Sequence, residues 1–200
     1  MALEIGYIPS AVIRDKVEDF LAEYHPSGDI PIPIIEIVEF DLGIEMFPLP
    51  DAQKIFGFMA ALSNDLQTIV YDERSDTKNP HRFRFTVAHE IGHRVLHGSP
   101  ISSLTLTDKQ AWKTAVSEID PKMYTRLEIQ AGIFAGQVLV PTLVLLVAVE
   151  EIVQRAQENK FNLSEAGDEA YDFVARPRAK RFNVSTDVIA RRIKAEGIQF

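Results

Sequence analysis

The stretch TVAHEIGHRVLH, residues 86–97, holds three of the five histidines of the chain. His89 and His93 are four positions apart, so on an α-helix their imidazoles share one face with about 6 Å of axial rise between them. Glu90 follows His89 directly, which completes the pattern His-Glu-x-x-His. In this pattern two histidines bind zinc and the glutamate accepts a proton from metal-bound water. The stretch therefore predicts a helix with a metal centre suited to peptide hydrolysis; an ordinary surface helix with chance histidines is the alternative.

A catalytic zinc ion takes three protein ligands and keeps one position for water or substrate. His97 lies eight residues beyond His89, about 12 Å along a helix, which is too far for zinc–nitrogen bonds of about 2 Å to span. We expect His97 beside the ligands or at the helix end. The candidate third ligand is Glu128, at the start of an uncharged segment in the next long helix.

Small residues surround the candidate carboxylate. Gly132 and Gly136 follow Glu128 at four-residue steps, and Gly92 lies inside the motif. We expect these glycines to let the two helices approach closely; simple packing beside a solvated Glu128 is the alternative. Tyr124 lies one turn before Glu128, where its phenol could stabilise a developing oxyanion or serve as a packed, hydrogen-bonded side chain.

The composition indicates a globular chain of 200 residues, 46% hydrophobic, that forms one domain or one domain with a small appendage. The net charge of -8 argues against coating of nucleic acid, and the absence of cysteine limits metal ligands to His, Asp and Glu. The first residues do not resemble a signal peptide, so we expect a cytoplasmic protein. Residues 129–149 are uncharged and long enough to cross a bilayer, but Pro141 divides them into two pieces suited to buried helices, so no membrane contact is expected.

Helix and strand signals follow the order helix, small sheet, helices. The expected strands are 44–47, 57–62 and 67–71, the last two joined by a turn at 63–65. The expected helices are 10–24, 33–43, 80–98 and 121–141, followed by a helical pattern from 142 that is interrupted at 158–162 and at Pro177, is capped again at Ser185 and ends near Gly197. This order predicts an α+β fold with a small, mainly antiparallel sheet, in which residues 1–141 form the motif-bearing domain and residues 142–200 a helical carboxyl-terminal extension packed on it.

Two blocks, RFRFTVAHEIGHRVLH (82–97) and EIQAGIFAGQVLVP (128–141), resemble the ImmA/IrrE family of zinc metallopeptidases, compact relatives of the gluzincin proteases. The resemblance implies a zincin-like fold, zinc held by His89, His93 and Glu128, and Glu90 as the general base. It also implies a substrate class, because these proteins are similar to regulators that cleave or inactivate a helix-turn-helix transcriptional repressor. In gluzincins an edge strand receives the substrate in extended form, and we expect the strand at 67–71 to do so here.

Two positions depart from the family pattern. Gln130 stands where the family usually has Glu, and Gly132 stands where it has Asn or Asp. A side chain at 132 would be placed to hydrogen-bond a ligating histidine, and loss of such a partner typically costs about 10- to 100-fold in metal affinity or activity. These departures keep a second hypothesis open: a non-hydrolytic module that retains the fold and binds a repressor or DNA.

The basic segment 176–194 carries a net charge of +6, whereas the rest of the chain carries -14, which together give the -8 of the whole chain. Its sequence resembles a helix-turn-helix with Val184 and Ser185 at the turn, which would suit DNA. The family commonly ends in a similar segment that packs on the protease. Packing, docking onto a partner protein and DNA contact are the three interpretations; the apolar residues for packing are Phe182, Val184, Val188, Ile189 and Ile193.

Overall fold

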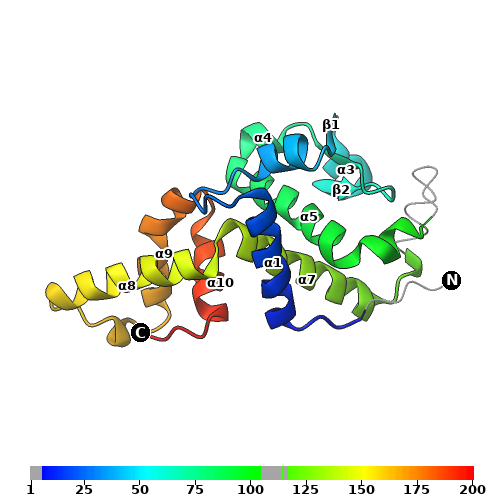
Figure 1. Cartoon of the computed structure of the whole chain (residues 1–200). Helices are drawn as coiled ribbons and strands as arrows, with labels where there is room; N and C mark the ends of the chain where they lie inside the picture. The colour runs from blue at the N-terminus through cyan, green and yellow to red at the C-terminus, as the bar shows by residue number, and fades with distance from the viewer. Residues whose placement is uncertain (1–5, 105–113, 115–116) are drawn as a thin grey trace.

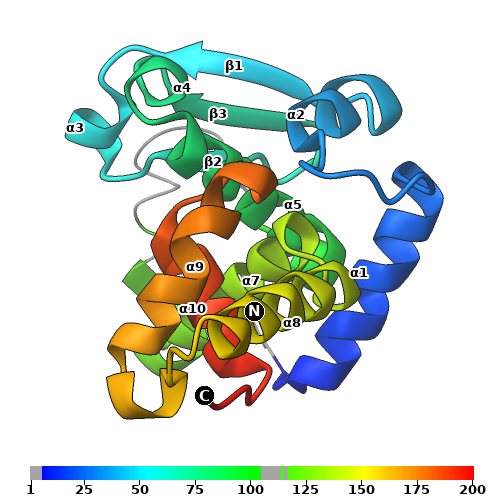
Figure 2. The same cartoon turned by 90° about the vertical axis from the view of Figure 1, so that its left-hand side faces the viewer.

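The structure is a computed structural model that describes residues 6–104, 114 and 117–200. A small sheet lies over the central helix α5, with α7 beneath α5 and the last helices gathered at one end of the molecule (Figures 1 and 2). The elements are α1 (Ser10–Tyr24), α2 (Ile34–Glu36), the π-helix η1 (Ile37–Asp41), β1 (Glu45–Leu49), α3 (Ala52–Phe56), β2 (Ala60–Leu62), β3 (Thr68–Asp72), α4 (Ser75–Lys78), α5 (Pro80–Ser102), α7 (Pro121–Leu139), α8 (Thr142–Glu158), the 3-10 helix η2 (Leu163–Ala166), α9 (Glu169–Phe182) and α10 (Thr186–Ala195).

The predicted starts of the two long central helices are confirmed. The Asn79 side chain accepts a hydrogen bond from the Arg82 amide, and Pro80 is the first helical residue of α5. The Asp120 carboxylate accepts two amide hydrogen bonds at the start of α7, again just before a proline. Both caps satisfy amides that have no partner within the helix, and proline loses nothing at this position. Helix α5 runs past the expected end at Gly98 and contains Pro100.

The close contact between α5 and α7 predicted at Gly92 is present. The residues of α7 that meet Gly92 are Ala131 and Phe134, and not the expected Gly132 and Gly136. A Cβ atom at Gly92 would lie 2.9 Å from the carbonyl oxygen of Ala131 and 3.2 Å from the Cβ of Phe134. At Gly136 a Cβ would instead meet the Arg192 side chain of α10, and at Gly132 it would meet nothing within 4 Å. The buried face of α7 is therefore the one that carries Ala131, and the two glycines lie beside it.

The sheet is mixed, with the strand order β1-β3-β2, and not mainly antiparallel as expected. β2 and β3 form the predicted antiparallel hairpin, whereas β1 pairs with β3 in parallel from Glu45↔Thr68 to Leu49↔Asp72. Along the sequence α3 connects β1 to β2, and in the sheet these two strands lie on opposite sides of β3. Because β3 is the central strand, the expectation that residues 67–71 form the edge that receives substrate is wrong; β2 is the edge strand on the side of α5.

The uncharged segment around Pro141 forms two helices, as predicted. α7 and α8 meet at an angle of 63° across a short break. No single described helix is long and apolar enough to span a membrane, and only this bent pair would reach the necessary length and hydropathy together. Pro177 lies inside α9 and does not interrupt it, contrary to expectation. One hydrophobic cluster contains residues from both sides of the expected boundary at 141, including Phe134 and Phe182.

The basic segment packs on the rest of the molecule. Four of its five expected packing residues are buried, and Val188 is partly buried against the same core. Ser185 caps α10 as predicted, accepting from the Val188 amide. Five of the seven basic side chains in segment 176–194 form ion pairs with carboxylates: Arg178 and Arg181 with Glu151, Arg191 with Asp187, Arg192 with Glu196, and Lys194 with Asp168. Much of the positive charge is therefore neutralised within the chain.

Candidate metal centre

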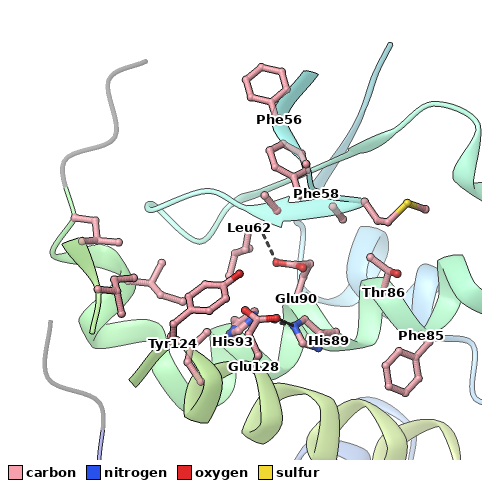
Figure 3. A pocket seen from close by; sticks show the side chains of 18 residues that line it. Phe56, Phe58, Leu62, Phe85, Thr86, His89, Glu90, His93, Tyr124 and Glu128 are labelled. Carbon is pink, nitrogen blue, oxygen red and sulfur yellow. Dashed lines mark hydrogen bonds and ion pairs between the residues drawn. The ribbon is translucent and has the colours of Figure 1, made fainter. Parts of the chain in front are cut away.

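The structure brings together the two motif histidines and the carboxylate of α7. The Nε2 atoms of His89 and His93 lie 3.0 Å apart on α5. Glu128 Oε2 lies 3.2 Å from His89 Nε2, and Glu128 Oε1 lies 3.5 Å from His93 Nε2. Figure 3 shows the three side chains converging beneath the edge strand β2.

These separations fit a divalent cation. Zinc bonds of about 2.0–2.1 Å in a tetrahedron place neighbouring ligand atoms about 3.3 Å apart, close to the three distances between His89, His93 and Glu128. A carboxylate oxygen of Glu90 also lies within 4.8 Å of the two imidazole nitrogens. Glu128 is the better third ligand, because one Glu90 oxygen is already held by the main chain of β2.

The pKa shifts of His89 and Glu128 indicate that these two side chains share a proton at the position where a cation would bind. Burial disfavours the charged form of His89, but its hydrogen bond to Glu128 and the charges of Glu90 and Glu128 raise the pKa of His89 overall. Burial likewise opposes ionisation of Glu128, yet the neighbouring His89 and His93 rings hold the pKa of Glu128 far below its usual range. Glu128 is therefore a carboxylate at neutral pH, and a metal ion would compete with the proton shared between His89 and Glu128.

The Glu90 side chain lies between the imidazoles and the sheet (Figure 3). Its Oε2 accepts a hydrogen bond of 2.9 Å from the Leu62 amide, and the residue is only 7% exposed. The edge strand thus fixes one oxygen of this carboxylate and leaves the other beside the candidate metal position. Tyr124, which is 40% exposed, directs its hydroxyl group toward the same space. Burial and the charge of Glu128 raise the pKa of Tyr124, which keeps the phenol protonated at neutral pH.

Behind His93 a buried hydrogen-bond chain determines which nitrogen carries the proton. Gln130 Nε2 donates to the Gly6 carbonyl (3.2 Å), so its Oε1 is the acceptor for His97 Nε2 (2.8 Å). His97 then has a free lone pair at Nδ1, 3.3 Å from His93 Nδ1, and can only accept there. Burial lowers the pKa of His97 to about 4, which keeps this ring neutral. His93 therefore carries its proton on Nδ1 and presents the bare Nε2 lone pair that a metal requires.

His89 has no equivalent support. Its Nε2 meets His93 and Glu128, but among the described residues nothing hydrogen-bonds its Nδ1. The family's Asn or Asp would occupy position 132, and the space at Gly132 is open. The two departures from the family pattern thus have different consequences: Gln130 supplies a partner for the histidine chain, and Gly132 leaves a gap beside His89.

The candidate metal ligands line a cavity of about 430 Å³ under β2. Its other walls are largely apolar and include Phe58, Leu62, Ile101 and Leu127. Sequence reasoning missed the Leu62 amide, because a main-chain donor leaves no pattern in the side chains. It treated Gln130 only as a departure, although its place four residues before Phe134 puts it on the face of α7 that meets α5.

Comparison with known proteins places the chain in a family. None of the curated proteins compared with it is a significant match. A family model described as the IrrE N-terminal-like domain matches residues 41–194, which include both motif blocks, the sheet and the whole basic segment. With the converging His89, His93 and Glu128 side chains, this match identifies the chain as a member of the ImmA/IrrE family of metallopeptidase-type proteins.

Proposed function

We propose that the chain is a zinc-dependent endopeptidase that cleaves a regulatory protein, a helix-turn-helix transcriptional repressor being the expected substrate. The observation that carries the reaction type is the convergence of His89, His93 and Glu128, with the Glu90 carboxylate next to them and held by an edge strand. The substrate class rests on the family resemblance alone. Zinc is favoured by two imidazoles and one carboxylate, although other divalent metals accept the same ligands.

Each residue of the centre has a distinct part in this proposal. Bound zinc would polarise the substrate carbonyl and lower the pKa of water to about 7. Glu90, with one oxygen held by the Leu62 amide, would take the proton of the attacking water on its other oxygen and pass it to the leaving amine. The protonated Tyr124 hydroxyl would hydrogen-bond the developing oxyanion. An extended substrate would lie along β2, the sheet edge nearest the centre.

Substitution of the base tests the reaction. Glu90→Gln keeps the shape of the side chain but cannot accept the proton, so we expect full zinc content and loss of cleavage of a co-expressed repressor. Glu158→Gln, an exposed residue on α8, is the matched control. His93→Ala should lose the metal, with His25→Ala as its control. Cleavage that persists in Glu90→Gln would contradict the assigned base, and full zinc content in His93→Ala would contradict the assigned ligand.

A non-hydrolytic module is the second candidate, and the unsupported His89 favours it. In that case the purified chain would hold metal weakly or not at all, and the repressor would leave its operator without being cut. Elemental analysis of the purified chain, together with a search for a cut repressor fragment, separates the two functions. DNA binding by the chain alone, lost steeply with added salt, would instead assign the basic segment 176–194 to DNA.

A further inference from the structure

A second cavity, of about 740 Å³, adjoins the metal centre. It is lined by residues of α1, α5, α7 and α10, and we call it the α10 groove. Phe85, His89 and Glu128 line both this groove and the cavity under β2. The two hollows therefore meet at the candidate metal ligands, and a molecule in the α10 groove touches two of them. The volume lies in the range typical of ligand pockets.

Three residues that line the α10 groove each have a buried side-chain atom without a hydrogen-bond partner among the described residues. In the described part of the chain, four buried side-chain atoms lack any hydrogen bond, and three of them belong to residues that line this groove: Arg14 Nε, His81 Nδ1 and Gln137 Oε1. Gln137 is only 3% exposed. Each of these atoms is closed off from solvent, so it lies behind the surface of the groove and becomes available to an occupant only when its side chain turns toward the groove.

Four arginines and three carboxylates line the α10 groove, which leaves one positive charge unbalanced. Arg14 and Arg192 both pair with the single carboxylate of Glu196, each at 2.7 Å. Arg82 lines the groove, and no carboxylate of the described residues lies within ion-pair distance of its guanidinium. An occupant with an acidic group would balance this charge.

The floor of the groove admits a chain backbone. A Cβ atom at Gly132 would meet nothing within 4 Å, so this position offers space directly beside the metal ligands. Ile129, which is 56% exposed, and Val188 add apolar surface to the same groove. The occupant therefore combines hydrogen-bonding groups, an acidic group and apolar parts.

We infer that the α10 groove binds the polypeptide substrate on one side of the cleaved bond and selects an acidic side chain there. An Asp or Glu side chain of the substrate pairs with Arg82, and the substrate main chain lies in the open space beside Gly132. A chain that continues past His89 and Glu128 reaches the cavity under β2, whose apolar walls take the residues on the other side of the bond. The inference rests on the proposed endopeptidase function.

Cleavage profiling of the zinc-loaded protein tests the inference. The wild-type chain is incubated with a peptide mixture from a digested proteome, and cut sites are identified by mass spectrometry. We expect enrichment of Asp and Glu on one side of the cut bond. Arg82→Glu should lower kcat/KM for acidic peptides about threefold to tenfold relative to neutral peptides, as expected for one partly exposed charge pair. Arg176→Glu, an exposed charge reversal outside the groove, should not change the preference.

A substitution that fills the groove provides a second, independent test of the inference. Gly132→Leu should fill the α10 groove and raise KM at unchanged zinc content, while Ala22→Leu on the exposed face of α1 should change neither. If the wild type cleaves peptides but Arg82→Glu and Gly132→Leu leave preference and KM unchanged, the groove assignment is wrong and the proposed function stands.

If the wild type cleaves nothing, the proposed function fails, and the groove is tested by retention of the same peptides on the immobilised zinc-loaded chain. Retention of acidic peptides that Gly132→Leu abolishes would support a peptide site, and no retention would overturn it. A small molecule that copurifies with the wild type and not with Gly132→Leu would assign the groove to that molecule and also overturn the inference.

Discussion

Replacement of Gln130 by leucine tests the hydrogen-bond chain behind His93. Leucine has a similar size but removes the acceptor that holds the Nε2 proton of His97, a residue that is 1% exposed. His97 can then move its proton to Nδ1, where it would donate to His93 and force the His93 proton onto Nε2. That proton would block the lone pair that a metal needs. The change therefore acts on metal binding through two intervening rings.

The magnitude follows from the kind of contact that is lost. Removal of a group that orients a ligating histidine typically costs about 10- to 100-fold in metal affinity, or about 1.4–2.8 kcal/mol. We expect a loss of this size for zinc in Gln130→Leu. The buried Nε2 atom of His97, left without a hydrogen-bond partner, should also lower the free energy of unfolding of the metal-free chain by about 1–3 kcal/mol.

The assay is competition for zinc against a chromophoric chelator at fixed pH, together with nitrogen-15 NMR of the imidazoles to identify which nitrogens are protonated. Gln130→Glu keeps an acceptor at the same place and should retain zinc affinity. Gln154→Leu, on the exposed face of α8, is the control for the polar-to-apolar change. Zinc affinity of Gln130→Leu within twofold of the wild type, with the proton of His93 still on Nδ1, would refute the assigned chain of hydrogen bonds.

Three further predictions concern packing, pH and the phenol. Gly92→Ala forces a Cβ against the α7 backbone and should destabilise the chain by about 1–3 kcal/mol in urea denaturation. Gly132→Ala places its Cβ in open space and should stabilise the chain by about 0.5–1 kcal/mol. Equal effects of the two substitutions would contradict the close approach of α5 and α7 at Gly92. The folded metal-free chain raises the pKa of His89, so the stability from its pair with Glu128 is full below about pH 6.5 and is lost as pH rises through that raised pKa. Zinc affinity should rise over the same pH interval. Denaturation and zinc titration at several pH values should therefore show opposite slopes, and parallel slopes would exclude the shared proton. Tyr124→Phe should lower kcat on the order of a hundredfold at unchanged zinc content, and an unchanged kcat would assign the phenol to packing.

The features that the sequence predicted well are those encoded locally. The cap at Asp120, the four-residue spacing of His89 and His93 and the break at Pro141 each act within one or two helical turns, so their outcome does not depend on distant parts of the chain. The position of Glu128 opposite the histidines was expected from its place in the next long helix and from the family resemblance.

The features that the sequence did not predict depend on how distant elements pack. Whether β3 is central or at the edge depends on the path of α3, which no alternation within the strands records. The face of α7 that meets α5 is decided by Ala131 and not by the more conspicuous Gly132 and Gly136. The role of Gln130 required the positions of His97 and Gly6, which are 33 and 124 residues away in the sequence.

The hydrogen bond from Gln130 to the carbonyl of Gly6 has a practical consequence for anyone who expresses this protein. Trimming the amino terminus to begin at residue 7, or attaching a rigid tag immediately before it, would remove or displace the oxygen that sets the orientation of the amide. Preparations that differ only at this end would then differ in how much zinc they retain.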